Sequence, residues 1–424
     1  MSTFIVNNEG PLQGFVEVSG SKNAVLPLMA ATLLTEDECC ITDVPKLMDV
    51  EVMCGLLRSF GADVCGDMDE HRITVKADTI ITTSAPCELV KKMRASVVAM
   101  GPLLARTGSA RIPLPGGCAI GDRPIDLHIK GFHALGAEIN VRQEEDGHEL
   151  VEATATRLTG AEIYLDTPSV GATENIMMAA SLADGDTVIE NAAQEPEIVD
   201  LANYMNKMGA RIKGAGTDII KIKGVKSMHG AAHAVIPDRI EAGTFMLAAA
   251  ITGGDVTIAN MLPDHVKPIA AKLRECGCIV ENTLEGTRVR LNGRAPTSTD
   301  IKTLPYPGFP TDIQPQFMTF LTTVNGPSMI LETVFENRFM HIEQLNKMGA
   351  NIREDGRRAF IPGGIKLIGA EVTATDLRAG AALVLAGLSA AGETVISDVY
   401  HIDRGYDNII QKFRSIGGSV ERRD

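Results

Sequence analysis

The stretch from Asp200 to Ile212, DLANYMNKMGARI, has the pattern of an amphipathic helix that ends at a glycine and leads into a strand. Its apolar residues recur at helical spacing up to Met208, and glycine is the residue that most often closes a helix. Five more stretches end in the same way: FGADV, LGAEI, CGCIV, MGANI and IGGSV. Their glycines are Gly61, Gly136, Gly277, Gly349 and Gly417. With Gly209 they follow one another at 68 to 75 residues, which indicates a repeated structural unit.

Each unit also contains an apolar helical run, such as ENIMMAASLA at 174–183 or AGTFMLAAAIT at 242–252. A short alternating strand follows the run, such as DTVIENA at 186–192. Alternation of helices with strands predicts an α/β protein, and units of this length exceed those of solenoids. We therefore expect two domains with three units in each.

Matching residues stand where the apolar helix of each unit should begin. They are Lys22, Arg94, Val170, Arg239, Asp312 and Leu377, which precede their glycines by 37 to 42 residues. Helix N-termini favour phosphates and carboxylates, because they expose backbone N–H groups and the positive end of the helix dipole. Arg123 and Arg404 both stand 13 residues before a glycine, in the second and sixth units. We therefore expect each half of the chain to offer an arginine to one shared anion.

Length and charge exclude several classes of protein. A chain of 424 residues exceeds one ordinary core, which agrees with two domains. A formal net charge of −14 argues against a nucleic-acid surface, because phosphate binding requires a basic face. The start MSTFIVNNEG shows no secretory leader, and no apolar run is long enough to cross a membrane. We expect a soluble, cytoplasmic protein.

The eight cysteines and nine histidines show neither metal-ligand spacing nor a disulfide framework. Most of the cysteines are therefore expected to be small core residues. No metal and no cofactor are predicted.

The second unit carries an additional glycine-rich loop, LPGGCAIG at 114–121, with Cys118 at its tip. An insertion in one unit of a repeated scaffold indicates function, because packing does not require it. The nearby Arg123 would favour a thiolate, whereas burial would favour the neutral thiol. A tuned, reactive Cys118 and a purely structural one are both compatible with the sequence.

Other charged candidates also have two interpretations. Lys22 stands at an expected helix start, where a cation is unfavourable unless an anion binds, although it could be an ordinary surface lysine. Asp312 could simply cap its helix, and this is the more usual role of an aspartate at that place. Arg338 and Arg404 could form surface ion pairs.

At these residues the chain resembles a known family. The motifs SGSKNA, LPGGCAIGDRPIDLH, PSVGAT, FPTDIQPQF, ETVFENRFMH and YHIDRGY, in this order along nearly the whole chain, resemble the enolpyruvyl transferases, in particular the UDP-N-acetylglucosamine 1-carboxyvinyltransferases. The resemblance implies two domains, each an inside-out α/β barrel of three βαβαββ-type units, with the active site in the cleft between them. One domain would combine residues 1–21 with 237–424, and the other would span 22–236.

The resemblance also implies a reaction. The enolpyruvyl group of phosphoenolpyruvate would pass to the 3′-hydroxyl of UDP-N-acetylglucosamine with release of phosphate, the first committed step of peptidoglycan precursor synthesis. Cys118 would be the general acid and could form a covalent adduct with the enolpyruvyl substrate, and Asp312 would be the base. Lys22, Arg123 and Arg404 would hold phosphoenolpyruvate, with Arg94 and Arg338 nearby.

The resemblance further places a set of residues around the nucleotide sugar: Asn23, Arg123, Pro124, Ile125, Asp126, Leu127, Ser169, Val170, Gly171, Asp312 and Val334. Cys118, Asp312, Lys22 and Arg404 would form the catalytic set. The expected partners are the two small-molecule substrates alone, with no nucleic acid, membrane or obligate protein partner.

Two other functions stay open. 5-Enolpyruvylshikimate-3-phosphate synthases share the implied fold and donor, but their acceptor is a small phosphorylated ring and they lack the cysteine loop. A non-catalytic repeat scaffold that binds a nucleotide or a partner is an alternative of a different class.

Overall fold

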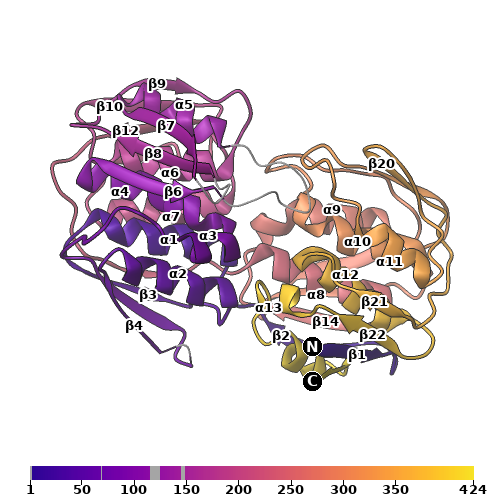
Figure 1. The fold of residues 1–424 in the computed structure, drawn as a ribbon. Helices are drawn as coiled ribbons and strands as arrows, with labels where there is room; N and C mark the ends of the chain where they lie inside the picture. Colours follow the sequence, from indigo (N-terminus) through magenta and orange to yellow (C-terminus); the bar gives the residue numbers. More distant parts are fainter. Residues whose placement is uncertain (1, 68, 115–124, 145–148) are drawn as a thin grey trace. The chain divides into compact units, whose positions relative to one another are not determined.

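The computed structural model describes residues 2–67, 69–114, 125–144 and 149–424. These residues divide into two compact units (Figure 1). The first unit combines the described residues of Met1–Ser19 and Pro237–Asp424, and the second those of Gly20–Gly117 and Arg123–Ile236. The second unit is therefore inserted between an N-terminal segment and the remainder of the first.

Three small sheets form the first unit within the described residues, and they share one arrangement. Each has an edge strand parallel to its neighbour, followed by two antiparallel pairings. In spatial order the sheets are β2 (Gln13–Glu17), β14 (Asp255–Ala259), β16 (Thr287–Leu291) and β15 (Cys278–Asn282); β17 (Ile301–Lys302), β18 (Ser328–Leu331), β20 (Arg358–Ile361) and β19 (Arg353–Asp355); and β21 (Glu371–Thr373), β22 (Thr394–Ser397), β1 (Thr3–Asn7) and β23 (Ser419–Arg423). In the first of these sheets, Phe15 of β2 pairs with Thr257 of β14.

The sheets of the second unit follow the same order of parallel and antiparallel pairs. They are β13 (Ala232–Ala234), β3 (Glu38–Thr42), β5 (Arg72–Lys76) and β4 (Asp63–Asp67); β9 (Glu162–Tyr164), β10 (Asp186–Glu190), β12 (Ile219–Lys223) and β11 (Ile212–Lys213); and β6 (Ser109–Pro113), β8 (Glu149–Thr154) and β7 (Glu138–Gln143). Beside β6, a single parallel bridge between Ser84 and Arg111 stands where the other sheets have an edge strand.

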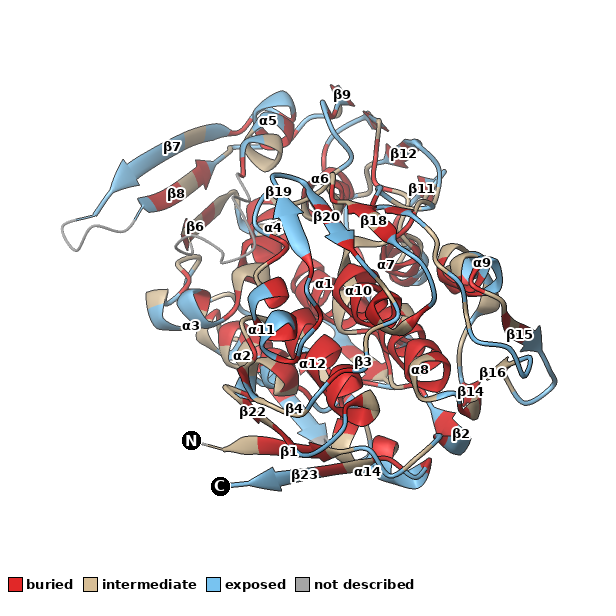
Figure 2. Ribbon diagram, turned by 90° about the vertical axis from the view of Figure 1, so that its right-hand side faces the viewer, coloured by how far each residue is buried: buried red, intermediate tan, exposed pale blue. Residues whose placement is uncertain are grey.

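A buried helical segment leads into the strand that pairs with the parallel edge of each sheet, although the edge strands β2 and β13 are each followed along the chain by the helix of the other unit. In the first unit these helices are α8 (Arg239–Thr252), α10 (Gln314–Thr323) and α12 (Leu377–Ser389), which contact one another. In the second unit they are α1 (Lys22–Ala31) with η1 (Thr32–Leu34), η2 (Arg94–Ala99) with α4 (Met100–Thr107), and α6 (Val170–Ala180). Figure 2 shows these helices almost wholly buried, so they form the two hydrophobic cores.

The remaining helices are mostly shorter, and several bury only one side. They are α2 (Met48–Ser59), α3 (Cys87–Lys92), α5 (Asp126–Ala134), α7 (Pro196–Lys207), η3 (Pro263–Val266), α9 (Lys267–Glu275), η4 (Thr311–Ile313), α11 (His341–Lys347), α13 (Tyr400–Asp403) and α14 (Ile409–Ser415). The predicted alternation of helices with strands is confirmed.

The six repeated glycines close helices, as the sequence predicts. Each follows the C-cap of its helix with φ between 86° and 106°, a conformation that only glycine adopts at little cost. The predicted helix starts are confirmed as well. Lys22, Arg94, Val170, Arg239 and Leu377 are the first residues of α1, η2, α6, α8 and α12, and Asp312 lies in η4 directly before α10. Lys22, Arg94 and Arg239 therefore lie at helix N-termini.

Candidate active site

The N-terminus of α6 lies against α5 in the second unit. Ser169 caps α6, its hydroxyl accepting a hydrogen bond from the backbone N–H of Ala172 at 3.4 Å. At Gly171 a Cβ would lie 3.2 Å from Cε1 of His128, so only a glycine allows this approach without displacing the imidazole. The predicted residues 125–127 at the start of α5 and 169–171 at the start of α6 are therefore neighbours.

Asn175 of α6 holds this arrangement. Its side chain is buried; Nδ2 donates to the carbonyl oxygen of Val97 at 2.9 Å and to Nδ1 of His128 at 2.8 Å. Its Oδ1 accepts from the backbone N–H of Gly101 at 2.7 Å. Burial, and to a lesser degree the charge of Arg94, lowers the pKa of His128 from 6.5 to about 4. His128 is therefore neutral near pH 7 and can accept the hydrogen bond from Asn175.

Lys22 is held at the first position of α1 by an ion pair. Its Nζ lies 2.7 Å from Oδ2 of Asp49 in the first turn of α2, and the two side chains are 11% and 4% exposed. Asn23 follows as the second residue of α1 and is half-buried. The carboxylate of Asp49 balances a cation that the helix dipole would otherwise disfavour.

In the first unit, Asp312 lies between two buried arginines. Its Oδ1 accepts from Nη2 of Arg338 at 2.9 Å, and its Oδ2 accepts from Nη2 of Arg378 at 3.1 Å. The arginine side chains are 2% and 4% exposed, whereas that of Asp312 is 27% exposed. Two guanidinium groups thus orient a carboxylate that solvent or a ligand can still reach.

This geometry corrects two interpretations of the sequence. The proposal that Asp312 caps its helix is wrong, since neither η4 nor α10 has a side-chain cap and the carboxylate contacts the arginines. The proposal that Arg338 is a surface group is also wrong, because its side chain is buried. Burial works to lower the pKa of Arg378, but Asp312, Tyr406 and Asp238 together outweigh it and raise that pKa above its ordinary value.

Further residues support this group. Nη1 of Arg338 lies 3.9 Å from Oδ1 of Asp376, the N-cap of α12. The guanidinium of Arg378 lies over the ring of Tyr406 at 5.5 Å. Arg404, at the C-cap of α13, contributes to lowering the pKa of His401, an effect second to burial, and Asp376 acts on the same imidazole in the opposite direction. Arg404 and Asp376 therefore lie within electrostatic range of one histidine.

Several predicted residues lie outside the described part of the chain, namely Cys118, Arg123 and Pro124. The seven cysteines inside it are free, and four of them are buried. Burial raises the pKa of the Cys276 and Cys278 thiols to about 12, so neither is a thiolate near neutral pH.

The sequence alone did not single out Asp49, His128, Asn175 and Arg378, nor Glu332, which directly follows β18. A signal for Arg378 was present, because an arginine in the first turn of α12 conflicts with the helix dipole just as Lys22 does in α1. Its partner Asp312 stands 66 residues away, and such a distance in sequence hides the pair.

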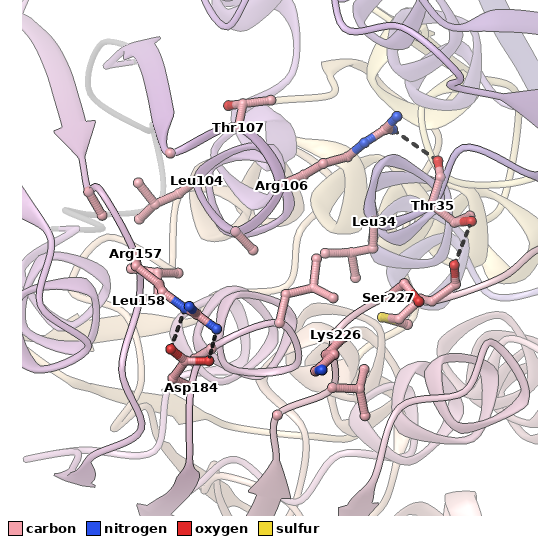
Figure 3. A pocket seen from close by; sticks show the side chains of 18 of the residues that line it. Leu34, Thr35, Leu104, Arg106, Thr107, Arg157, Leu158, Asp184, Lys226 and Ser227 are labelled. Carbon is pink, nitrogen blue, oxygen red and sulfur yellow. Dashed lines mark hydrogen bonds and ion pairs between the residues drawn. The ribbon is translucent and has the colours of Figure 1, made fainter.

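A separate pocket of about 910 Å³ opens in the second unit at the opposite ends of the core helices (Figure 3). It is lined by residues at and after the carboxyl ends of η1, α4 and α6, among them Thr35, Arg106 and Asp184. None of the described predicted site residues lines it. Carboxyl ends of helices disfavour anions, so the anionic ligands predicted above suit the other ends of these helices better.

The described residues contain no group of three or more His, Cys, Asp or Glu side chains arranged to hold a metal ion. Their helices are all too short or too polar to span a membrane.

Comparison with known proteins identifies the class. Residues 6–413 match the family model described as EPSP synthase (3-phosphoshikimate 1-carboxyvinyltransferase), and the chain belongs to this family. The described fold is similar to the enolpyruvyl transferase NikO from Streptomyces tendae, with a TM-score of 0.87, 24% identity and coverage of 100% of this chain and 99% of that one. An EPSP synthase from Acinetobacter baumannii is similar at a TM-score of 0.78, 17% identity and full coverage of both chains. These likenesses establish the enolpyruvyl transferase fold.

Sequence relatives are more specific. The chain is 59% identical over 420 residues to UDP-N-acetylglucosamine 1-carboxyvinyltransferase 1 of Caldanaerobacter subterraneus subsp. tengcongensis, covering 99% of both. It is 56% identical over 424 residues to UDP-N-acetylglucosamine 1-carboxyvinyltransferase 2 of Carboxydothermus hydrogenoformans, covering 100% of this chain and 99% of that protein.

Proposed function

We propose that this protein transfers the enolpyruvyl group of phosphoenolpyruvate to the 3′-hydroxyl of UDP-N-acetylglucosamine and releases phosphate, a step of peptidoglycan precursor synthesis. The observation that carries this proposal is the identity of 56–59% over essentially the whole chain to relatives named for this transfer. Both substrates are phosphorylated and water-soluble, so we place the reaction in the cytoplasm.

The nucleotide sugar is assigned to the second unit, at the paired starts of α5 and α6, together with Val334 and Asp312 of the first unit. The capped N-terminus of α6 offers backbone N–H groups that suit a diphosphate. Lys22, Arg123 and Arg404 are assigned to phosphoenolpyruvate, whose phosphate and carboxylate need cations, with Arg94 and Arg338 close to it.

The chemistry needs a base, an acid and a route for each proton. Asp312 accepts the proton of the sugar 3′-hydroxyl while the oxygen of that hydroxyl bonds to C2 of phosphoenolpyruvate. Cys118 supplies a proton to the methylene carbon. This gives a tetrahedral adduct with a methyl group. Asp312 has by then released its first proton to solvent, so it takes up a methyl proton as phosphate is expelled and the carbon–carbon double bond is restored, and the Cys118 thiolate regains a proton from solvent. Phosphate leaves with the electron pair of its bond to C2, so atoms and charge balance.

Two finer assignments rest on the same proposal. The six sheets with one order of pairings support the interpretation of six βαβαββ-type units, three to each unit of the fold, built as inside-out barrels. The protein is assigned no cofactor, since acid–base chemistry is sufficient for the transfer.

One assay tests the function against its alternatives. Phosphoenolpyruvate is mixed with the protein and either UDP-N-acetylglucosamine or shikimate 3-phosphate, and released phosphate is measured. Release with the nucleotide sugar alone is expected. Release with shikimate 3-phosphate alone would assign the sibling reaction that gives the family model its name, and no release with either would favour a binding scaffold.

A further inference from the structure

Glu332 is a buried carboxylate whose hydrogen bonds reach two separate parts of the candidate site. It directly follows β18, and its side chain is 1% exposed. Oε1 accepts from the hydroxyl of Thr303 at 2.8 Å and from the backbone N–H groups of Val334 and Phe335 at 2.8 and 3.3 Å. Oε2 accepts from the hydroxyl of Thr311 at 3.0 Å. All four of these donors therefore bond to the single side chain of Glu332.

The equivalent strand ends of the other sheets show what the fold itself requires here. Four of them carry an Asp or Asn at positive φ, namely Asp43, Asn191, Asn260 and Asp398. Nδ2 of Asn191 donates to the carbonyl of Leu165, the residue after β9, at 2.7 Å. Nδ2 of Asn260 donates to the carbonyl of Val18, the residue after β2, at 2.8 Å. In these two sheets, a single side-chain hydrogen bond is thus enough to hold the end of the second strand to the end of the parallel edge strand.

Glu332 and Thr303 occupy the corresponding places after β18 and β17. The bond between them fastens the sheet with the donor and acceptor roles exchanged. Holding the two strand ends together requires only this one bond. The bonds to Thr311, Val334 and Phe335 have no structural counterpart in the two sheets that carry Asn191 and Asn260. The longer carboxylate side chain therefore does more than an asparagine does at this place.

We propose that Glu332 is a positioning residue that joins the turn carrying Asp312 to the backbone at Val334. This inference rests on the proposed function, in which Asp312 is the base and Val334 contacts the nucleotide sugar. Thr311 directly precedes Asp312 in η4, so its bond to Glu332 fixes the turn that presents the base. One carboxylate then sets the distance between the base and the hydroxyl it must deprotonate, and proton transfer depends steeply on that distance.

Thr311→Val tests the link to the base, because it removes one hydroxyl and keeps the shape of the side chain. Thr287→Val is the control: Thr287 also lies in the first unit, where it is buried whereas Thr311 is half-buried, and its hydroxyl makes one side-chain bond, to Asn282 at 3.0 Å. Thr311→Val is expected to lower kcat by about tenfold or more, with the KM for phosphoenolpyruvate unchanged. The unfolding midpoints of the two variants should be similar.

Glu332→Gln and Glu332→Ala separate the two links. The glutamine oxygen can still accept from Val334 and Phe335, and its amide can donate to the Thr311 hydroxyl, so the KM for the nucleotide sugar should change little. Glu332→Ala should raise that KM and lower kcat together. A purely structural glutamate would instead reduce the amount of folded enzyme and leave kcat per folded molecule and both KM values as in the wild type.

The outcomes are distinct. The positioning role is overturned if Thr311→Val keeps the wild-type kcat, or if its kcat falls no further than that of Thr287→Val. This test does not depend on whether Glu332→Ala folds. Absence of phosphate release from the wild type and Thr287→Val overturns the proposed function itself, and the positioning role with it.

Discussion

Asn175→Ala tests whether one buried amide holds the nucleotide-sugar side of the second unit together. The wild-type side chain uses both hydrogens of Nδ2, on Val97 and His128, and its oxygen on the N–H of Gly101. The substitution leaves the N–H of Gly101 and Nδ1 of His128 in the interior without this partner, while the carbonyl oxygen of Val97 keeps its hydrogen bond from the N–H of Met100. It also releases α5, which carries residues 126–128, from α6 and its capped N-terminus.

The expected cost follows from the groups on Gly101 and His128. An unsatisfied buried donor or acceptor costs about 1–3 kcal/mol. Water can enter the space that the amide vacates, so we take the lower part of the range and expect a loss of roughly 2–3 kcal/mol in the free energy of unfolding. Because the starts of α5 and α6 would separate, the KM for UDP-N-acetylglucosamine should rise about tenfold, equivalent to about 1.4 kcal/mol.

Urea unfolding, hydrogen exchange and steady-state kinetics measure these effects. The amide of Gly101 should lose its protection in Asn175→Ala, since the amide oxygen of Asn175 is its acceptor. Asn206→Ala is the control, because Asn206 bonds twice to Ile212 at an exposed position, where water can replace it. We expect a loss below about 1 kcal/mol there. Equal losses in both variants, or unchanged protection at Gly101, would refute the reasoning.

Three further predictions concern single side chains. Cys118→Asp should keep substantial turnover with a more acidic pH optimum, and it should no longer be inactivated by an epoxide that resembles phosphoenolpyruvate. Cys118→Ser should lose most turnover, and full activity of this variant would contradict the role of Cys118 as general acid. Arg404→Ala should weaken phosphoenolpyruvate more than the nucleotide sugar in calorimetry, and unchanged phosphoenolpyruvate binding would remove Arg404 from the anion site. Burial lowers the pKa of His341 from 6.5 to about 4, so the unfolded chain takes up the proton first and stability falls as pH drops from 6.5 to 4; His341→Gln should lose less stability over that range in urea titrations, and an equal loss would count against this assignment.

The local features of the fold were accessible from the sequence because each depends on neighbouring residues. Gly209 and its five equivalents end helices through a backbone conformation that glycine alone adopts freely, and this leaves a signature at a fixed place. The starts of α1, α6 and α12 follow residues that open helices, for example Ser169 and Asp376, whose side chains cap them.

Partners far apart in the sequence were not accessible. The pairs Lys22 with Asp49 and Asp312 with Arg378 join different helices, and no periodicity marks them. Asp312 shows the consequence, since the local pattern favours a capping role, whereas the structure directs its carboxylate to two arginines. Glu332 carried no signal of its own, because its function depends on the donors that the fold assembles around it.

A common electrostatic rule applies to one ion pair in each unit. Lys22 and Arg378 are cations in the first turns of α1 and α12, where the helix dipole disfavours them, and each is paired with a carboxylate from another helical segment. These pairs differ in exposure: Asp49 is 4% exposed, whereas Asp312 is 27% exposed. A buried carboxylate can only hold its cation, but a partly exposed one can also meet a substrate. The same arrangement therefore holds Lys22 in place in one unit and leaves the Asp312 carboxylate partly accessible in the other, as their proposed roles of anion ligand and base require.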